Sequence, residues 1–213
     1  MGVPRAADDP TTPSLRGPLA GFRSVFSDRS ATFCLLGTML TWASFMGSMT
    51  YSIPFFRETF SMAVVWASLL LSAMALSKTT GHLLIGPLVN RLGRKTAAVA
   101  TVTSTALFTA SYMMSKALWP SLALVCTSCV LAGFMHSSVD SFNLEQVSQF
   151  HGPMMSLSKA TSTLGGVIGS GLGGLTLILH GYSGVGAILG SFGIFSGIVY
   201  YTFAREPIPR TID

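Results

Sequence analysis

The sequence of 213 residues is rich in apolar residues and poor in charge, because 49% of its residues are hydrophobic and only 10% are charged. A soluble globular domain carries about 25% charged residues, so this composition argues against one and favours a protein embedded in a lipid bilayer. The formal net charge of +5 is small and scattered, which argues against nucleic acid as a partner and makes the basic residues markers of cytoplasmic loops.

The first 29 residues precede the apolar part of the chain. They contain four arginines and no apolar core, so we do not expect a cleavable signal peptide, and residues 1–13 have the composition of a disordered tail. Leu15, Leu19, Phe22 and Phe26 recur at helical spacing. We therefore predict a cytoplasmic segment over residues 1–29, with an amphipathic helix at 18–27 on the membrane surface.

Six apolar segments follow, each long enough to cross a bilayer, which takes about 20 residues. In lipid such a segment must be helical, because its backbone groups have to bond to one another. The segments cover residues 30–56, 62–89, 96–115, 118–139, 157–179 and 182–204. We predict an all-α membrane protein with a six-helix bundle over residues 30–205 and a cytoplasmic tail over residues 206–213.

The distribution of basic residues predicts the orientation of this bundle. With six crossings, the side that holds both termini has Arg5, Arg16, Arg23, Arg29, Arg91, Arg94, Lys95, Lys159, Arg205 and Arg210. The other side has only Arg57 and Lys116. Because basic residues concentrate on the cytoplasmic side, we expect both termini in the cytoplasm of a multi-pass protein of the plasma membrane.

Lys78 is the most unusual residue of the second segment, because it lies about 12 Å along the helix from Gly86, well inside the apolar layer. A charge at that depth is costly and therefore faces protein or water. His82 follows one turn later on the same face and could share a proton or a water with Lys78. Two interpretations stay open: Lys78 meets an anionic solute or a carboxylate of another half, or it snorkels to the headgroups.

The loop between the second and third segments carries an ordered motif. Its residues are Gly86, Leu88, Asn90, Arg91, Gly93, Arg94 and Lys95. This motif resembles the signature loop of the major facilitator superfamily, Gly-x-Leu-Ala-Asp-Arg-x-Gly-Arg-Lys/Arg, with Asn90 in place of the aspartate. Its glycines permit a tight turn, and its basic side chains can cap helix carboxyl ends or pair with carboxylates. The resemblance implies a cytoplasmic latch between Arg94 and an acidic residue beyond the fourth segment, with Asp140 as the first candidate and Glu145 as the second.

The fifth segment repeats glycine every fourth residue, at Gly165, Gly169 and Gly173. Small residues at this spacing let two membrane helices approach closely. The stretch is similar to the glycine-rich fifth or eleventh helix of the same superfamily, and we interpret these three glycines as helix-packing residues.

The resemblance also implies an architecture: one half of a full transporter, built as an inverted repeat of three plus three helices. The fourth segment lacks the arginine typical of amino-terminal halves, so the chain resembles the carboxy-terminal half. In this family the first and fourth helices of a half line the central cavity. The candidates for the solute pathway on the first helix are Trp42, Phe45, Ser48 and Tyr51; the alternative is that the aromatic residues contact lipid.

The function that the resemblance implies is secondary active transport of a small solute by alternating access. The expected partners are the lipid bilayer, the solute and a second six-helix half, which is a separate chain, a missing segment or a second copy. The alternative is a non-transporting membrane scaffold or sensor. We do not expect an enzyme, a cofactor or a metal site, because the sequence offers no paired carboxylates or nucleophile–base pair, and Cys34, Cys126 and Cys129 lie in apolar segments.

Overall fold

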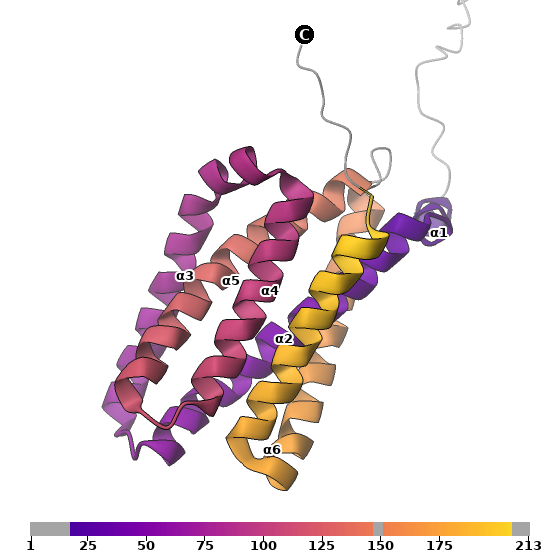
Figure 1. Ribbon diagram of the computed structural model, residues 1–213. Helices are drawn as coiled ribbons and strands as arrows, with labels where there is room; N and C mark the ends of the chain where they lie inside the picture. The colour runs from indigo at the N-terminus through magenta and orange to yellow at the C-terminus, as the bar shows by residue number, and fades with distance from the viewer. Residues whose placement is uncertain (1–17, 147–150, 206–213) are drawn as a thin grey trace, which may run out of the picture.

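The computed structural model describes residues 18–146 and 151–205, without the side chains of residues 18–20, 87, 88 and 90. The expected tails at 1–17 and 206–213 lie outside this range. The described chain forms α1 (Pro18–Ser27), α2 (Arg29–Thr59), α3 (Val64–Leu92), α4 (Arg94–Met114), α5 (Leu118–Gln146) and α6 (His151–Phe203) (Figure 1). Five of these helices, α2 to α6, are long and apolar enough to cross a membrane.

Helix α6 contains 53 residues but is interrupted at Gly181, where φ is 68° and ψ is −167°. Only glycine adopts such a conformation without strain. The chain turns back at this residue, so that α6 consists of two arms that run in opposite directions (Figure 1). These arms contain the fifth and sixth apolar segments of the sequence. The first arm begins at His151, earlier than the predicted residue 157, and the second ends at Phe203.

The largest interface in the bundle joins α2 to α6. Gly165 and Gly169 lie directly against the backbone of Met39 and Ala43, so a Cβ atom at either glycine would collide with a carbonyl oxygen of α2. Gly173 lies against the ring of Tyr51. The repeated glycines of α6 therefore face α2, and their lack of side chains lets the two backbones touch.

A second close helix–helix contact joins α3 to α5. No repeat of small residues in either helix predicted this contact. Gly81 of α3 and Gly133 of α5 face each other, and a Cβ atom on Gly133 would collide with the backbone oxygen of Lys78. This contact fixes the backbone of Lys78 against α5 and leaves its side chain free to extend elsewhere.

Hydroxyl groups bond across the interior of the bundle. Thr41 and Ser196 are 2.7 Å apart between their oxygens, and the Asn143 amide donates to Thr38 at 2.8 Å. Near the other end of α2, the Ser52 and Tyr112 oxygens are 2.7 Å apart. Such hydrogen bonds between membrane helices help to determine which helix faces pack together.

The ends of α2, α5 and α6 meet in one junction. Asp28 caps α2 by accepting hydrogen bonds from the backbone of Ser30 and Ala31 at 2.7 and 3.1 Å. The Ser30 hydroxyl donates to Gln146 at 2.6 Å and accepts from the Arg205 backbone at 2.8 Å. Helix α1, which has the bounds of the predicted surface helix, packs on this end of the bundle and buries Val25 completely.

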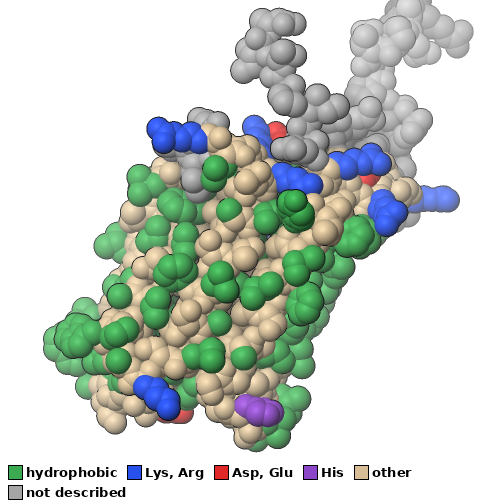
Figure 2. Space-filling model, viewed as in Figure 1, with side chains coloured by type: hydrophobic (Ala, Val, Ile, Leu, Met, Phe, Trp, Pro, Cys, Tyr) green, Lys and Arg blue, Asp and Glu red, His purple; other side chains and the backbone are tan. Residues whose placement is uncertain are grey.

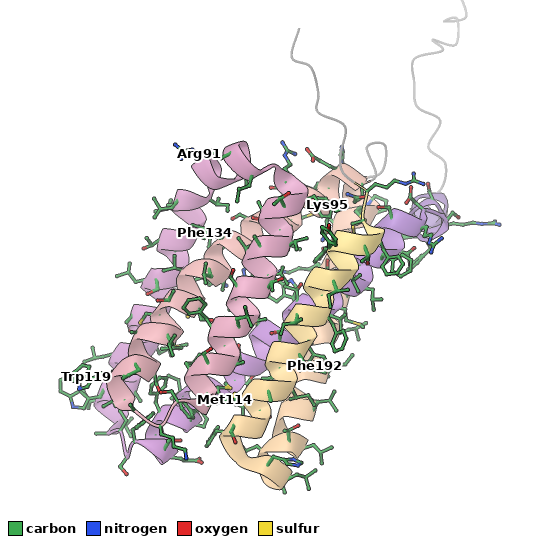
Figure 3. All side chains as sticks on the ribbon, viewed as in Figure 1. Arg91, Lys95, Met114, Trp119, Phe134 and Phe192 are labelled. Carbon is green, nitrogen blue, oxygen red and sulfur yellow. The ribbon has the colours of Figure 1, made fainter. Side chains whose placement is uncertain are left out.

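The two ends of the bundle differ in charge. Lys and Arg side chains gather at the end where α3 meets α4, whereas the flank of the bundle is apolar or uncharged (Figure 2). Arg91 and Lys95 lie at this basic end, and Met114 and Trp119 lie at the opposite end (Figure 3). Large apolar side chains stay exposed along the helices between them, including Leu83 and Ile178, as expected for a lipid-facing surface.

Candidate functional site

An aromatic cluster joins the middle of α2 to α5. The Trp42 and His136 rings stack with centroids 4.4 Å apart, and the Phe45 ring meets His136 edge-on at 4.8 Å. Trp42 and Phe45 also contact each other edge-on, with centroids 6.1 Å apart. Their spacing of three residues places both on one face of α2. His136 is nearly buried, and its Nε2 atom has no hydrogen-bond partner among the described residues.

Two lysines from different helices lie over these rings. The Lys78 ammonium of α3 is 4.8 Å from the centroid of Phe45, and the Lys159 ammonium of α6 is 5.4 Å from that of Trp42. Both distances fall within the range of about 6 Å in which a cation is attracted to an aromatic face. In the described part of the chain, neither lysine forms an ion pair with a carboxylate. We call Trp42, Phe45, Lys78, His136 and Lys159 the aromatic–lysine cluster.

The cluster borders an open groove of about 600 Å³ between α2 and the first arm of α6. Trp42 and Lys159 form one end of it, and Met46 and Val167 supply apolar walls. The hydroxyl groups along it belong to Thr50, Ser162, Thr163 and Ser170. A groove with cationic, aromatic and hydroxyl groups can orient a small solute, because these groups bind the charge and the apolar surface of the solute.

The remaining candidates for the solute pathway are His82, Tyr51 and Ser48, and only Tyr51 bonds to a residue of the groove. His82 is exposed, its Nδ1 is 2.9 Å from the Ser137 hydroxyl, and its ring centroid is 5.7 Å from that of His136. The Tyr51 hydroxyl donates to the carbonyl of Ser170 at the groove edge, at 2.5 Å. The structure does not bring Ser48 to the groove: it is fully buried, and its hydroxyl donates to the carbonyl of Phe45.

The basic loop joins α3 to α4 at the charged end, and its side chains contact α5 and the end of α6. Gly93 separates α3 from α4 with a φ of 77°, which favours glycine. Lys95 caps the end of α6 by donating to the Ala204 carbonyl at 2.8 Å. Arg94 forms an ion pair with Glu145, the second of its two candidate partners, and not with Asp140. The side chains of Leu88 and Asn90 lie outside the described residues.

Helix length explains the choice of Glu145. The sequence placed the end of the apolar segment at residue 139, but α5 continues to Gln146. Glu145 lies five residues beyond Asp140, which moves it about 7.5 Å along the helix and rotates it to a different face. The charged end of α5 therefore reaches the loop through Glu145.

Reversing the Arg94–Glu145 pair should measure its strength. Both side chains are partly exposed, at 47% and 29%, so the pair is expected to contribute about 0.2–1 kcal/mol. Arg94→Glu and Glu145→Arg alone should each lower the melting temperature, and the double variant should recover part of the loss. The same cycle with Asp140→Arg is the matched control. Equal recovery in both cycles would contradict a specific pair.

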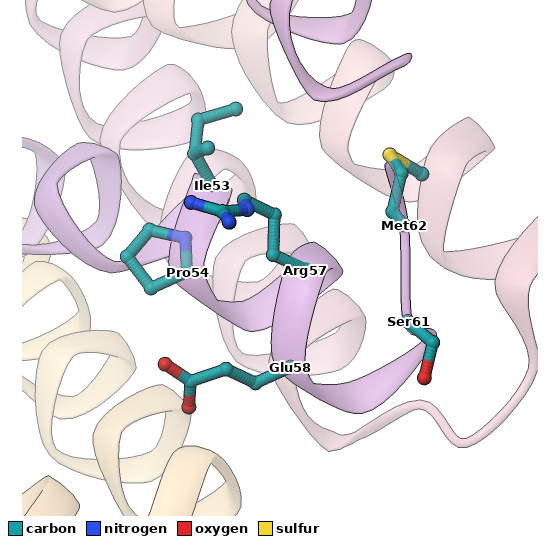
Figure 4. A pocket seen from close by; sticks show the side chains of 6 residues that line it. All are labelled: Ile53, Pro54, Arg57, Glu58, Ser61 and Met62. Atoms are coloured by element: carbon teal, nitrogen blue, oxygen red, sulfur yellow. The ribbon is translucent and has the colours of Figure 1, made fainter. Parts of the chain in front are cut away.

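A second hollow lies at the far end of α2, about 18 Å along the helix from Phe45. It measures about 400 Å³ and is lined by Ile53, Pro54, Arg57, Glu58, Ser61 and Met62 (Figure 4). It shares no residue with the aromatic–lysine cluster. Glu58 accepts a hydrogen bond from the Tyr182 hydroxyl at 2.8 Å, which ties α2 to α6 at this end.

Sequence reasoning missed two members of the cluster. Lys159 was used only to predict the orientation, and His136 was given no role. For Lys159 a signal was present, because it is a lone cation at the start of an otherwise uncharged segment. For His136 no pattern within α5 indicates that its ring stacks on Trp42.

Comparisons with known proteins add one finding. A family model described as Major Facilitator Superfamily matches residues 2–153, which include the basic loop and four of the membrane-length helices. No curated protein matches the sequence.

Proposed function

The chain belongs to the Major Facilitator Superfamily, whose members are transporters, and from this premise we propose that it moves a small solute by alternating access. It acts as one half of a secondary active transporter and faces a second six-helix half across the solute pathway. That half belongs to the same polypeptide, to a separate chain or to a second copy. The alternative of a scaffold or sensor has no observation in its favour.

The helices α2 to α6 support a proposal for the membrane topology. We propose six crossings: α2, α3, α4, α5 and the two arms of α6 on either side of Gly181. The charged end then lies in the cytoplasm with both termini, because basic residues concentrate on that side. Exposed Trp66 and Trp119 near the other end suit the outer interface, where amphipathic rings are favoured. The plasma membrane is the proposed location.

The aromatic–lysine cluster is the observation that carries the proposal. A lysine in the middle of a membrane helix is costly unless it meets water, an anion or another protein group. Lys78 and Lys159 approach one pair of aromatic rings from two helices, and Lys159 and Trp42 also line an open groove. A surface that served only for contact with lipid would gain nothing from two ammonium groups there.

Uptake into proteoliposomes tests transport even while the solute is unidentified. Liposomes with the full chain, together with its second half where that half is separate, are incubated with a pool of labelled small metabolites. We expect at least one solute to accumulate above the level in protein-free liposomes. A scaffold or sensor would give equal levels in both.

The proposed orientation predicts a labelling pattern in whole cells. Cysteines introduced singly by Glu58→Cys and Lys116→Cys should react with an impermeant thiol reagent added outside. A cysteine introduced by Arg94→Cys should react only after permeabilisation, because it lies at the basic, cytoplasmic end. The reverse pattern would overturn the orientation.

A further inference from the structure

We infer that the solute is a small organic anion, whose acidic group binds between Lys78 and Lys159 and whose apolar part lies along the groove beside Trp42. This inference rests on the proposed transport function and adds the chemical class of the solute to it.

The charge of the cluster supports an anion. Lys78 and Lys159 lie over the neighbouring rings of Phe45 and Trp42, and neither forms an ion pair with a carboxylate of the described residues. A negative group beside this aromatic pair is attracted to both ammonium groups, since attraction between opposite charges strengthens where water is excluded. A neutral or cationic solute gains no such attraction.

His136 supplies a polar group at the same place. Its ring contacts the rings of Trp42 and Phe45, over which the two lysines lie, and it is 8% exposed. Its Nε2 atom lacks a partner among the described residues. A buried polar atom is normally hydrogen-bonded, so this nitrogen is available to a bound solute or to a water that accompanies it.

The groove limits the size and shape of the anion. A volume of about 600 Å³ lies in the range of small-molecule sites, which is about 300–1,000 Å³. Its walls combine the apolar side chains of Met46 and Val167 with several hydroxyl groups. An inorganic ion would leave the apolar walls uncovered. An organic acid can contact the lysines with its acidic group and the apolar walls with the rest of its body.

Asp140 lies one helical turn after His136 on α5. It is exposed, and it forms no ion pair with either lysine of the cluster in the described chain. The two lysines outnumber it, so the surface keeps a positive charge. The competing occupant is a carboxylate from the facing half, and the experiment below separates the two.

Fluorescence of Trp42 measures binding directly. Trp66→Phe and Trp119→Phe remove the other two tryptophans, which are 65% and 78% exposed. The full chain in phosphatidylcholine nanodiscs is titrated with benzoate, 3-phenylpropionate and hexanoate, each compared with its uncharged amide. We expect at least one carboxylate to change the fluorescence saturably and its amide to bind at least about tenfold more weakly.

Lysine variants connect the binding to the cluster. Lys78→Met and Lys159→Met should each weaken carboxylate binding about tenfold or more, because each removes one charge from the site. Lys159→Arg keeps the charge and should retain most of the affinity. Lys116→Met, at the other end of the bundle, is the matched control and should bind normally. Size-exclusion profiles verify that each variant is folded.

Three results would overturn the inference: no carboxylate binds, an amide binds as tightly as its acid, or the lysine variants bind unchanged. If the lysines pair with a carboxylate of the facing half, their substitution weakens assembly of the halves and leaves carboxylate binding unaltered. The uptake assay tests the transport proposal independently of the anion inference. Accumulation of only neutral or cationic solutes refutes the inference that the solute is an anion and preserves transport. Accumulation of no solute refutes transport.

Discussion

Gly169→Val should lower the melting temperature of the protein more than any other single change considered. The new Cβ atom would collide with the backbone of Ala43, and backbone atoms cannot rotate away as a side chain does. Overpacking costs about 1–3 kcal/mol, and a collision with backbone places this substitution at the upper end of that range. Each kcal/mol lowers the melting temperature of a chain of this size by about 2–4 °C. We therefore expect a fall of about 6–12 °C, measured by thermal unfolding in detergent with size-exclusion detection.

Gly171 provides a control two residues further along the same helix. A Cβ atom there meets nothing within 4 Å, so Gly171→Ala removes only the conformational freedom of glycine. Alanine is more favourable than glycine in a helix by about 1 kcal/mol, and this variant should be as stable as the parent or more so. Equal destabilisation by both substitutions would mean that α2 and α6 do not pack through Gly169.

Lys78→Met should strongly reduce solute uptake while leaving the fold intact. Methionine keeps the unbranched stem and removes the charge. The contact of α3 with α5 uses the backbone oxygen of Lys78, which lies against Gly133, and the substitution does not alter it. We expect initial uptake into proteoliposomes to fall at least about tenfold, with an unchanged size-exclusion profile.

The matched control for this variant is Lys116→Met, which removes a lysine from the connection between α4 and α5. Its uptake should equal that of the parent. Normal uptake by Lys78→Met would mean that the Lys78 ammonium extends to the headgroups, and that its approach to Phe45 has no part in transport.

The helices were largely predictable from the sequence because lipid imposes a simple requirement. An apolar stretch must be helical and about 20 residues long to cross, so hydropathy located α2 to α5 and both arms of α6. Helix ends were less predictable. Helix α5 continues to Gln146 because backbone hydrogen bonding does not stop where the side chains become polar, and this extension gives Arg94 its partner Glu145.

The site was predictable only in part. Spacing within one helix placed Trp42 and Phe45 on a common face, and the depth of Lys78 marked it as unusual. The positions of His136 and Lys159 depend instead on how α5 and α6 pack against α2. That packing is determined by close contacts between helices, such as Gly81 with Gly133. Helical periodicity can mark the packing face of one helix, but it does not indicate which other helix that face meets.

Access to the groove from both sides of the membrane is the most direct test of alternating access. Thr163 is exposed and lines the groove, so Thr163→Cys places a reactive thiol there once Cys34, Cys126 and Cys129 are replaced by alanine. Leu107→Cys, on the exposed apolar surface of α4, is the lipid-facing control.

An impermeant thiol reagent is applied to right-side-out and to inside-out vesicles that contain each variant. We predict that the cysteine at position 163 reacts in both preparations, because the groove opens to each side in turn, and that the cysteine at position 107 reacts in neither. Reaction at position 163 from one side only, or from neither, would contradict the proposal that this groove is the solute pathway.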